Sequence, residues 1–165
     1  MSTQDALKAL EEAKCLEQEG QAFYRKAAEQ AKDEKGRQVF LSLIGDEVNH
    51  ERLIQREIDN LTREGKWARL TEVSPVKCDL TEPIFPQGRA GLQKAVKADT
   101  GETEALLVAL EMENNSYDLY RRRAEASTNP PERAMYEFLA SQERTHFDLL
   151  MANYEAMVSL GGWAD

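Results

Sequence analysis

Two four-residue stretches decide the fold: Glu-Val-Asn-His at residues 47–50 and Glu-Arg-Thr-His at residues 143–146. They contain the only two histidines of the chain, and each histidine follows a glutamate by three residues. Residues i and i+3 are neighbours on one face of an α-helix, so each pair can converge on one ligand. Both stretches lie in longer segments whose apolar residues recur at intervals of three and four, which indicates amphipathic helices.

This apolar periodicity predicts four helices, over about residues 3–32, 36–64, 102–127 and 130–158. Asn129 followed by Pro130 is typical of a helix start, and Asp99 with Glu102 resembles a capping box. Residues 65–100 contain three prolines and no sustained period. We therefore expect an all-α, antiparallel four-helix bundle of two hairpins, 3–64 and 101–158, joined by a long crossover.

The two halves of the chain match each other with a constant offset of 96 residues. The offset aligns the two Glu-x-x-His stretches and also Glu17 with Glu113. Glu17 and Glu47 are equidistant from the first predicted turn, and Glu113 and Glu143 are equidistant from the second. In an antiparallel hairpin such residues lie side by side, so the repeat predicts two carboxylate pairs near the middle of the bundle.

Four glutamates on core-facing stripes need positive charge near them. A buried, unpaired carboxylate costs several kcal/mol, and four at one level would repel one another. Histidines bonded to glutamates in an ordinary core would leave carboxylate oxygens unsatisfied. A ligand set rich in oxygen, with nitrogen and without sulfur, suits iron or manganese better than structural zinc. The predicted metal ligands are Glu17, Glu47, His50, Glu113, Glu143 and His146.

The composition excludes several other classes of protein. A net charge of −9 disfavours nucleic acid as a partner. No window approaches the length of apolar sequence that a membrane span needs, and the N-terminus lacks the apolar stretch of a signal peptide, so we expect a cytoplasmic protein without membrane contact. Cys15 and Cys78 form no CxxC pair, and we expect both to be free thiols.

Longer motifs resemble the rubrerythrin branch of the ferritin-like superfamily. Residues 17–24 (EQEGQAFY) with 47–50 are similar to the first hairpin of that family, and residues 113–120 (ENNSYDLY) with 143–146 are similar to the second. The resemblance implies one ferritin-like diiron domain over residues 1–165.

The resemblance also implies roles for individual residues. Glu47 and Glu143 would bridge the two metals, while Glu17 and Glu113 would be terminal ligands. Tyr24 and Tyr120 would lie near the site and donate hydrogen bonds to ligand carboxylates, with ordinary core packing as the alternative for both.

Two features depart from the rubrerythrin pattern. The chain has no paired CxxC motifs and hence no rubredoxin domain, so electrons would come from an external reductant such as a rubredoxin-like protein or a reductase. Ser116 stands where the family carries an additional glutamate. The remaining set of four glutamates and two histidines is equally similar to the ferroxidase centre of bacterioferritin.

Three functions follow from the site and its resemblance. The first is reduction of hydrogen peroxide by a non-haem diiron oxidoreductase; the second is oxidation of Fe(II) with dioxygen; the third is a non-catalytic bundle that metal stabilises. The expected cofactors are two iron ions, with a mixed manganese–iron pair left open, and neither haem nor flavin. The small residues Gly20 and Ser116 would leave room for the oxidant, with close helix packing as the alternative at Gly20.

The family analogy suggests a homodimer. Apolar surface would be covered by Trp67, Ile84, Phe85 and Trp163. The alternative is that these side chains pack the crossover and the tail of the same chain onto the bundle.

Overall fold

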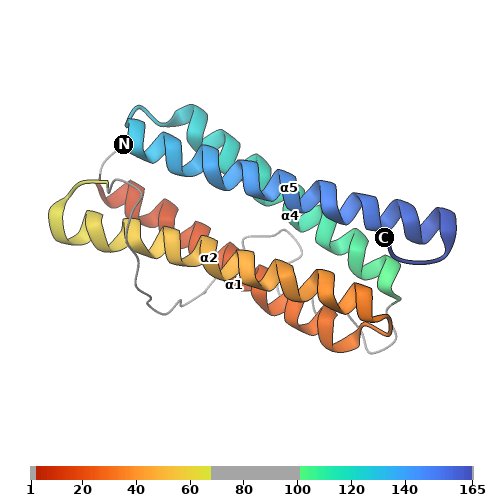
Figure 1. Ribbon diagram of the computed structural model, residues 1–165. Coiled ribbons are helices and arrows are strands. Elements are labelled where there is room, and N and C mark those ends of the chain that lie inside the picture. Colours follow the sequence, from red (N-terminus) through yellow and green to blue (C-terminus); the bar gives the residue numbers. More distant parts are fainter. Residues whose placement is uncertain (1–2, 68–100, 165) are drawn as a thin grey trace.

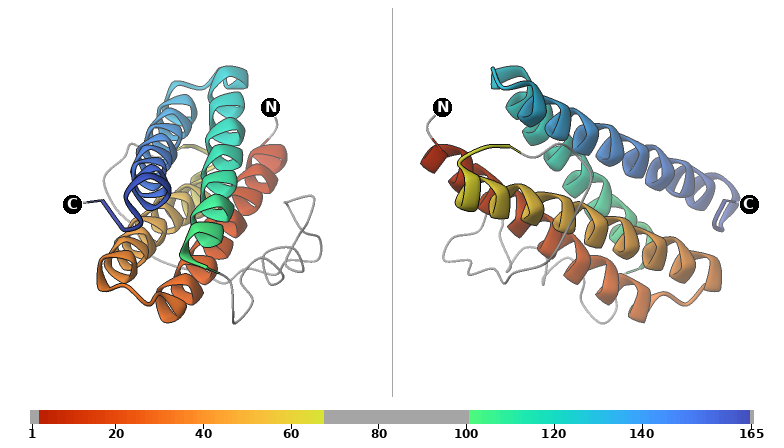
Figure 2. Two further views of the ribbon diagram at one scale, coloured as in Figure 1. Left: turned by 90° about the vertical axis from the view of Figure 1, so that its right-hand side faces the viewer. Right: turned by 60° about the vertical axis from the view of Figure 1, so that its left-hand side comes forward.

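The computed structural model describes residues 3–67 and 101–164. They form four helices, α1 (Thr3–Gln30), α2 (Glu34–Glu64), α4 (Glu102–Ala126) and α5 (Pro130–Leu160). Helix α1 packs along α2, and α4 packs along α5, so that two hairpins form the two layers of a bundle (Figures 1 and 2). The predicted all-α bundle is thereby confirmed, and each predicted helix end lies within two residues of the observed one. Residues 68–100 of the predicted crossover lie outside the described residues.

The 96-residue repeat extends to the ends of the helices. Asp33 and Asn129 are equivalent, and their side chains accept hydrogen bonds from the first-turn backbone of α2 and α5, at 2.8 and 3.2 Å. Gly65 and Gly161 are also equivalent and end these helices with φ of 65° and 73°, a left-handed conformation that favours glycine. The predicted helix start at Asn129 is confirmed. The repeated unit is therefore a whole capped hairpin.

Helix α4 begins at the predicted residue, Glu102, but its cap differs from the prediction. Its N-cap is Gly101, so the capping box predicted from Asp99 and Glu102 was wrong. The Glu102 carboxylate instead accepts hydrogen bonds from the backbone N–H groups of Lys32, at 2.7 Å, and Asp33, at 3.0 Å. The start of the second hairpin is thus bonded to the turn of the first.

Two apolar clusters fill the bundle, one at each end. The first, here called the Trp163 cluster, contains Tyr24, Phe40, Leu43, Leu106, Leu110, Leu150 and Trp163 among others. The second, here called the Tyr136 cluster, contains Leu10, Ile54, Ile58, Tyr120, Tyr136 and Leu139 among others.

Every helix contributes to both clusters, and its buried site glutamate lies between the two contributions. In α1 the Tyr136 cluster comes before Glu17 and the Trp163 cluster comes after it, whereas in α2 the order around Glu47 is reversed. The same alternation holds in α4 and α5. Each fully buried Leu or Ile stabilises the fold by about 1.5–3 kcal/mol. Burial of the two clusters therefore offsets the cost of the polar site residues buried between them.

The tail beyond α5 packs onto the bundle. Trp163 is 7% exposed and meets the ring of Phe40 edge-on, with centroids 5.6 Å apart. A Cβ atom on Gly36 would lie 2.3 Å from Trp163, so only glycine fits beneath the indole. Packing onto the bundle, rather than onto a second subunit, therefore accounts for Trp163. Ile84 and Phe85 lie outside the described residues, and the homodimer stays a prediction.

Two further expectations concern compartment. No helix among residues 3–67 and 101–164 is long and apolar enough to cross a membrane. Cys15 is disulfide-bonded, so the expectation of a free thiol was wrong there. Cys78 lies outside the described residues.

Candidate dimetal site

Six side chains from all four helices converge between the two apolar clusters. Each is at most 4% exposed. Helices α1 and α4 contribute one glutamate each, and α2 and α5 contribute one glutamate and one histidine each. In chain order they are Glu17, Glu47, His50, Glu113, Glu143 and His146. The structure thus brings together every residue that the sequence predicted as a metal ligand.

These side chains form two overlapping groups, each with ligand atoms within 4.8 Å of one another. The first group is Glu17, Glu47, His50 and Glu143; the second is Glu47, Glu113, Glu143 and His146. Glu47 and Glu143 belong to both groups. The geometry therefore supports the bridging role that the family resemblance implies for these two carboxylates.

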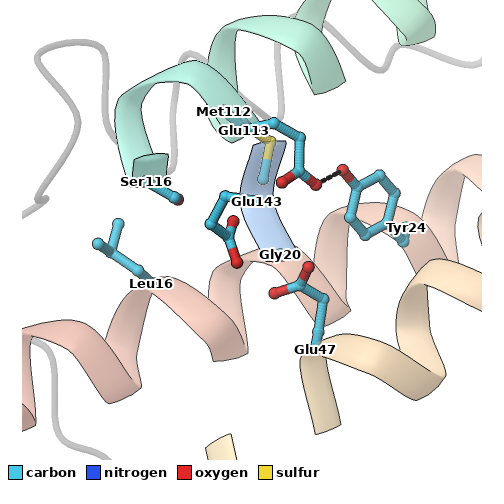
Figure 3. Close-up of a pocket in the computed structure, with 8 residues that line it drawn as sticks. All are labelled: Leu16, Gly20, Tyr24, Glu47, Met112, Glu113, Ser116 and Glu143. Atoms are coloured by element: carbon cyan, nitrogen blue, oxygen red, sulfur yellow. Dashed lines mark hydrogen bonds between the residues drawn. The ribbon is translucent and has the colours of Figure 1, made fainter. Parts of the chain in front are cut away.

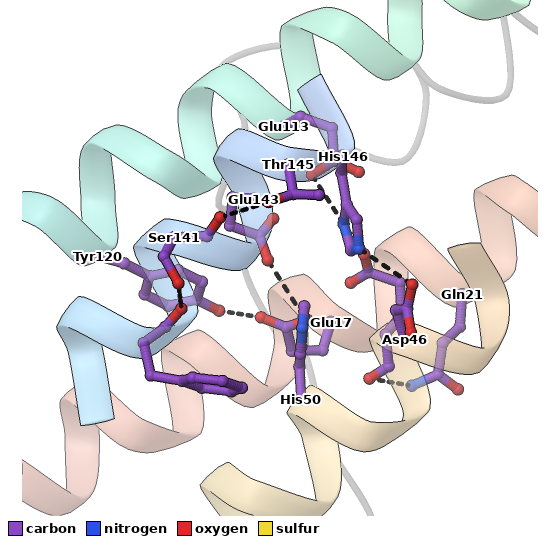
Figure 4. A network of polar contacts seen from close by, with 12 residues as sticks. Glu17, Gln21, Asp46, His50, Glu113, Tyr120, Ser141, Glu143, Thr145 and His146 are labelled. Carbon is purple, nitrogen blue, oxygen red and sulfur yellow. Dashed lines mark hydrogen bonds and ion pairs between the residues drawn. The ribbon is translucent and has the colours of Figure 1, made fainter. Parts of the chain in front are cut away.

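The histidines face the carboxylates through the same ring atom. His50 Nδ1 lies 3.2 Å from Glu17 Oε2 and 3.1 Å from Glu143 Oε1. His146 Nδ1 lies 3.3 Å from Glu47 Oε1 and 3.4 Å from Glu113 Oε2 (Figure 4). Because the offset of 96 converts the first set of contacts into the second, the site is a pseudo-twofold arrangement of two equivalent halves.

The polar atoms at the centre lack enough hydrogen-bond donors. Glu47 Oε1, Glu113 Oε2, Glu143 Oε1 and His146 Nδ1 are buried without a hydrogen-bond partner. An unsatisfied buried polar atom costs about 1–3 kcal/mol, and more when it is charged. Carboxylate oxygens and imidazole nitrogens are ligands that iron and manganese accept. The residues therefore fit a pair of divalent cations, which would satisfy all of these atoms at once.

The carboxylates of the metal-free site cannot all be ionised comfortably. Burial, followed by the charges of Glu17 and Glu143, raises the pKa of Glu47 well above its ordinary range. Burial, followed by the charges of Glu17 and Glu113, does the same to the pKa of Glu143. Burial would also raise the pKa of Glu17, but the hydrogen bond and charge of His50 outweigh it, and that pKa is lowered. Burial and neighbouring charge therefore favour the protonated form of the two shared carboxylates in the metal-free site.

Two tyrosines hold the other two carboxylates from across the bundle. Tyr24 of α1 donates a hydrogen bond to Glu113 of α4, and Tyr120 of α4 donates one to Glu17 of α1. Both rings are fully buried. Burial, followed by the charge of the partner glutamate, raises the pKa of each phenol well above its ordinary value, so both remain hydrogen-bond donors. The hydrogen bonds that the resemblance implies are thus present.

A small pocket opens beside the carboxylates on the side of α1 and α4 (Figure 3). It has room for about one water-sized molecule. Gly20 and Ser116 both line it, as predicted, together with the apolar side chains of Leu16 and Met112. A Cβ atom on Gly20 would lie 3.1 Å from Glu47 Oε2, so a larger residue would displace that carboxylate.

Sequence reasoning missed one charged neighbour of the site. Asp46, half exposed on α2, places Oδ2 3.4 Å from His146 Nε2, on the side of the ring that faces away from the centre. A carboxylate there favours the tautomer with the proton on Nε2, which leaves the Nδ1 lone pair directed at the centre. The only sequence signal that could have pointed to Asp46 was its position directly before the predicted ligand Glu47. The equivalent position beside His50 is Gln142, so the two halves differ here.

The fold and the site together define a class: a ferritin-like helical bundle with a buried carboxylate–histidine cluster compatible with a diiron site. A comparison with family profiles matches residues 8–154 to Rubrerythrin. The chain therefore belongs to the rubrerythrin family. A comparison with curated proteins found no match.

Proposed function

We propose that this protein is a non-haem diiron oxidoreductase that reduces hydrogen peroxide with electrons from an external donor. The observation that carries the proposal is the pair of overlapping ligand groups that share Glu47 and Glu143. Such a site would hold two ions close together, and a two-electron change divided between two ions matches reduction of an O–O bond to water. Membership of the rubrerythrin family supports iron as the metal.

The bound iron would supply Lewis acidity and two electrons. The residues of the chain supply the rest. Glu47 and Glu143 release their protons when cations bind and so provide the negative charge that holds them. Tyr24 and Tyr120 fix the outer carboxylates by hydrogen bonds. The pocket beside Gly20 has room for about one water-sized molecule, and Leu16 and Met112 form the apolar part of its wall.

One observation favours a second candidate function, oxidation of Fe(II) with dioxygen. The pocket is lined by Ser116 where rubrerythrins would place another carboxylate. The described site is therefore a symmetric set of four glutamates and two histidines, which resembles a ferroxidase centre. In this case Fe(II) is also a substrate, and iron uptake continues after the site is filled.

Anaerobic loading separates these candidates. Metal-free protein is titrated with Fe(II), the bound iron is counted per chain, and single portions of peroxide or dioxygen are then added. The proposal predicts two irons per chain and oxidation that is much faster with peroxide. Faster oxidation with dioxygen, together with further iron uptake, would favour the ferroxidase. A bundle that loses its helices on chelation and reacts with neither oxidant would have a structural metal instead.

A further inference from the structure

Three aromatic side chains form a continuous line from the site to the edge of the Tyr136 cluster. Tyr120, which bonds Glu17, stacks on Tyr136 with ring centroids 6.1 Å apart and planes 26° from parallel. Tyr136 then meets the ring of Trp67 edge-on at 6.4 Å. The two tyrosines are buried, whereas Trp67 is half-buried and reaches solvent. The line therefore joins a site carboxylate to the surface.

The repeat builds a second line with one chemical difference. Tyr24 stacks on Phe40 at 6.2 Å, and Phe40 meets Trp163 at 5.6 Å. Phe40 is equivalent to Tyr136, and Trp163 to Trp67, by the same offset of 96. Phenol and indole rings can lose one electron inside a protein, but the benzene ring of phenylalanine cannot. Only the line through Tyr136 consists of oxidisable rings from end to end.

Packing does not explain the hydroxyl group of Tyr136. The hydroxyl oxygen is buried without a hydrogen-bond partner, which costs about 1–3 kcal/mol. Phenylalanine at the equivalent position 40 shows that the fold needs only the ring. Glu132 lies one helical turn before Tyr136, and its buried Oε1 also lacks a hydrogen-bond partner. Residues i and i+4 are neighbours on one helix face, so a change of side-chain rotamer would bring the Glu132 carboxylate to the phenolic proton.

We propose that Trp67, Tyr136 and Tyr120 form a one-electron relay between the surface and the metal site. The proposal rests on the proposed diiron function. In iron-loaded protein, Tyr120 would give one electron to the metal site, whose total charge would fall by one, and the phenolic proton would move along the hydrogen bond to Glu17. Tyr136 then reduces Tyr120 and passes its own proton to Glu132.

The remaining steps restore the starting state. Trp67 reduces Tyr136, both tyrosines recover their protons, and an external one-electron reductant restores Trp67. Two such passages supply the two electrons, and solvent supplies the two protons, that one molecule of peroxide consumes in forming two waters; no side chain is changed at the end. The half-buried indole of Trp67 is the point at which the reductant delivers its electrons.

Flash photo-oxidation tests the relay without any metal. Full-length, metal-free protein carrying Trp163→Phe retains Trp67 as its single tryptophan, since the chain has two. A ruthenium(III) tris-bipyridine oxidant generated by a flash removes one electron from Trp67, and transient absorbance follows the radical. The flash drives the Trp67–Tyr136 step in reverse, and electron exchange between the two rings predicts that the tryptophanyl signal converts into a tyrosyl signal. Adding Tyr136→Phe should abolish that conversion and leave the tryptophanyl radical to persist.

Tyr117 provides the matched control, because it also packs against the Tyr136 cluster but belongs to neither line of rings. Tyr117→Phe should leave the conversion unchanged. Equal conversion with and without the Tyr136 hydroxyl would overturn the relay, as would loss of conversion in the Tyr117 variant alone. If Trp163→Phe disturbs the helices by circular dichroism, the same comparison is made with Trp163 in place.

Iron-loaded protein then separates the relay from the proposed function. After one addition of peroxide, a one-electron reductant should restore the iron more slowly in Trp67→Phe than in Trp163→Phe. Equal rates in both variants would contradict the relay. Absence of iron binding or of oxidation by peroxide would contradict the proposed function, while the photo-oxidation result would still decide the relay.

Discussion

Tyr24 in the first hairpin donates a hydrogen bond to Glu113 in the second. The repeat supplies the reciprocal bond from Tyr120 to Glu17. These crossed bonds join α1 and α4 at the level of the site, where each carboxylate is held by a helix other than its own. Cohesion of the two hairpins and orientation of the carboxylates therefore depend on the same pair of contacts.

Replacing either tyrosine by phenylalanine should destabilise the metal-free protein. The ring still packs, but Glu113 or Glu17 loses its donor, and a hydrogen bond to a charged group is worth about 1.5–3 kcal/mol. The free energy of unfolding in urea should fall by this amount in Tyr24→Phe and in Tyr120→Phe. Half-buried Tyr117 serves as the control, and its phenylalanine variant should change by less than about 0.5 kcal/mol. Wild-type stability in both site variants would show that the crossed bonds contribute nothing.

Loss of a shared glutamate should weaken the binding of both iron ions, whereas loss of an outer glutamate should weaken the binding of one. Glu47→Gln removes a charge from both ligand groups, and Glu17→Gln removes a charge from the first group only. We expect about one iron per chain to remain after Glu17→Gln and none to be held tightly after Glu47→Gln. Metal analysis after gel filtration measures this, with exposed Glu111→Gln as the control. Equal losses in the two site variants would contradict the overlap.

The metal-free protein should become less stable as the pH rises above about 4.5. The folded-state pKa of both Glu47 and Glu143 is raised above the usual 4.5 by burial and neighbouring carboxylates. Such groups stabilise the fold below their unfolded pKa, and this stability is lost as the pH rises through the folded pKa. Glu17, whose pKa is lowered, acts in the opposite sense and only below about 4.5.

Urea unfolding between about pH 5 and about pH 8 tests this dependence. The midpoint should fall with rising pH in the metal-free protein, and bound iron should remove the fall. The double variant Glu47→Gln with Glu143→Gln should show a smaller fall over the same range. The remaining fall comes from His50: burial would lower its pKa, but the hydrogen bond and charge of Glu17 outweigh burial, and that pKa is raised. A midpoint that rises with pH in the metal-free protein would mean that the carboxylates are not shifted in the stated direction.

A methyl group at position 20 should slow oxidation of the loaded protein. The new Cβ would lie in the lining of the pocket, 3.1 Å from Glu47 Oε2, so the carboxylate must also shift by a few tenths of an ångström. We expect Gly20→Ala to retain its iron but to react more slowly with peroxide. Gly45→Ala is the matched control, because a Cβ there meets nothing within 4 Å. If the two variants react at the same rate, the pocket is not the route of the oxidant.

Most of the fold could be predicted because periodicity and turn chemistry are local. The intervals of three and four residues located all four helices, and Asn129 with Pro130 marked the start of α5. The cap of α4 could not be read in this way, although its first residue could. Glu102 accepts bonds from the turn of the other hairpin, at a distance of about 70 residues in sequence that no local pattern reports.

The same distinction holds for the site. The spacing and the repeat predicted that the six ligands lie close together, because residues equidistant from a turn lie side by side in an antiparallel hairpin. Asp46 was missed because its contact with His146 crosses from one hairpin to the other. The ring contact between Tyr120 and Tyr136 depends on side-chain directions across a turn, and the free-thiol expectation for Cys15 rested on the assumed compartment alone.

The central claim is that the six side chains bind two metal ions that share Glu47 and Glu143. Crystals of the protein soaked with Fe(II) without air, and measured on both sides of the iron absorption edge, test it most directly. Two anomalous peaks per chain are expected inside the cluster, with both shared carboxylates between them. A single peak, peaks only at the surface, or no peak in fully soaked crystals would contradict it.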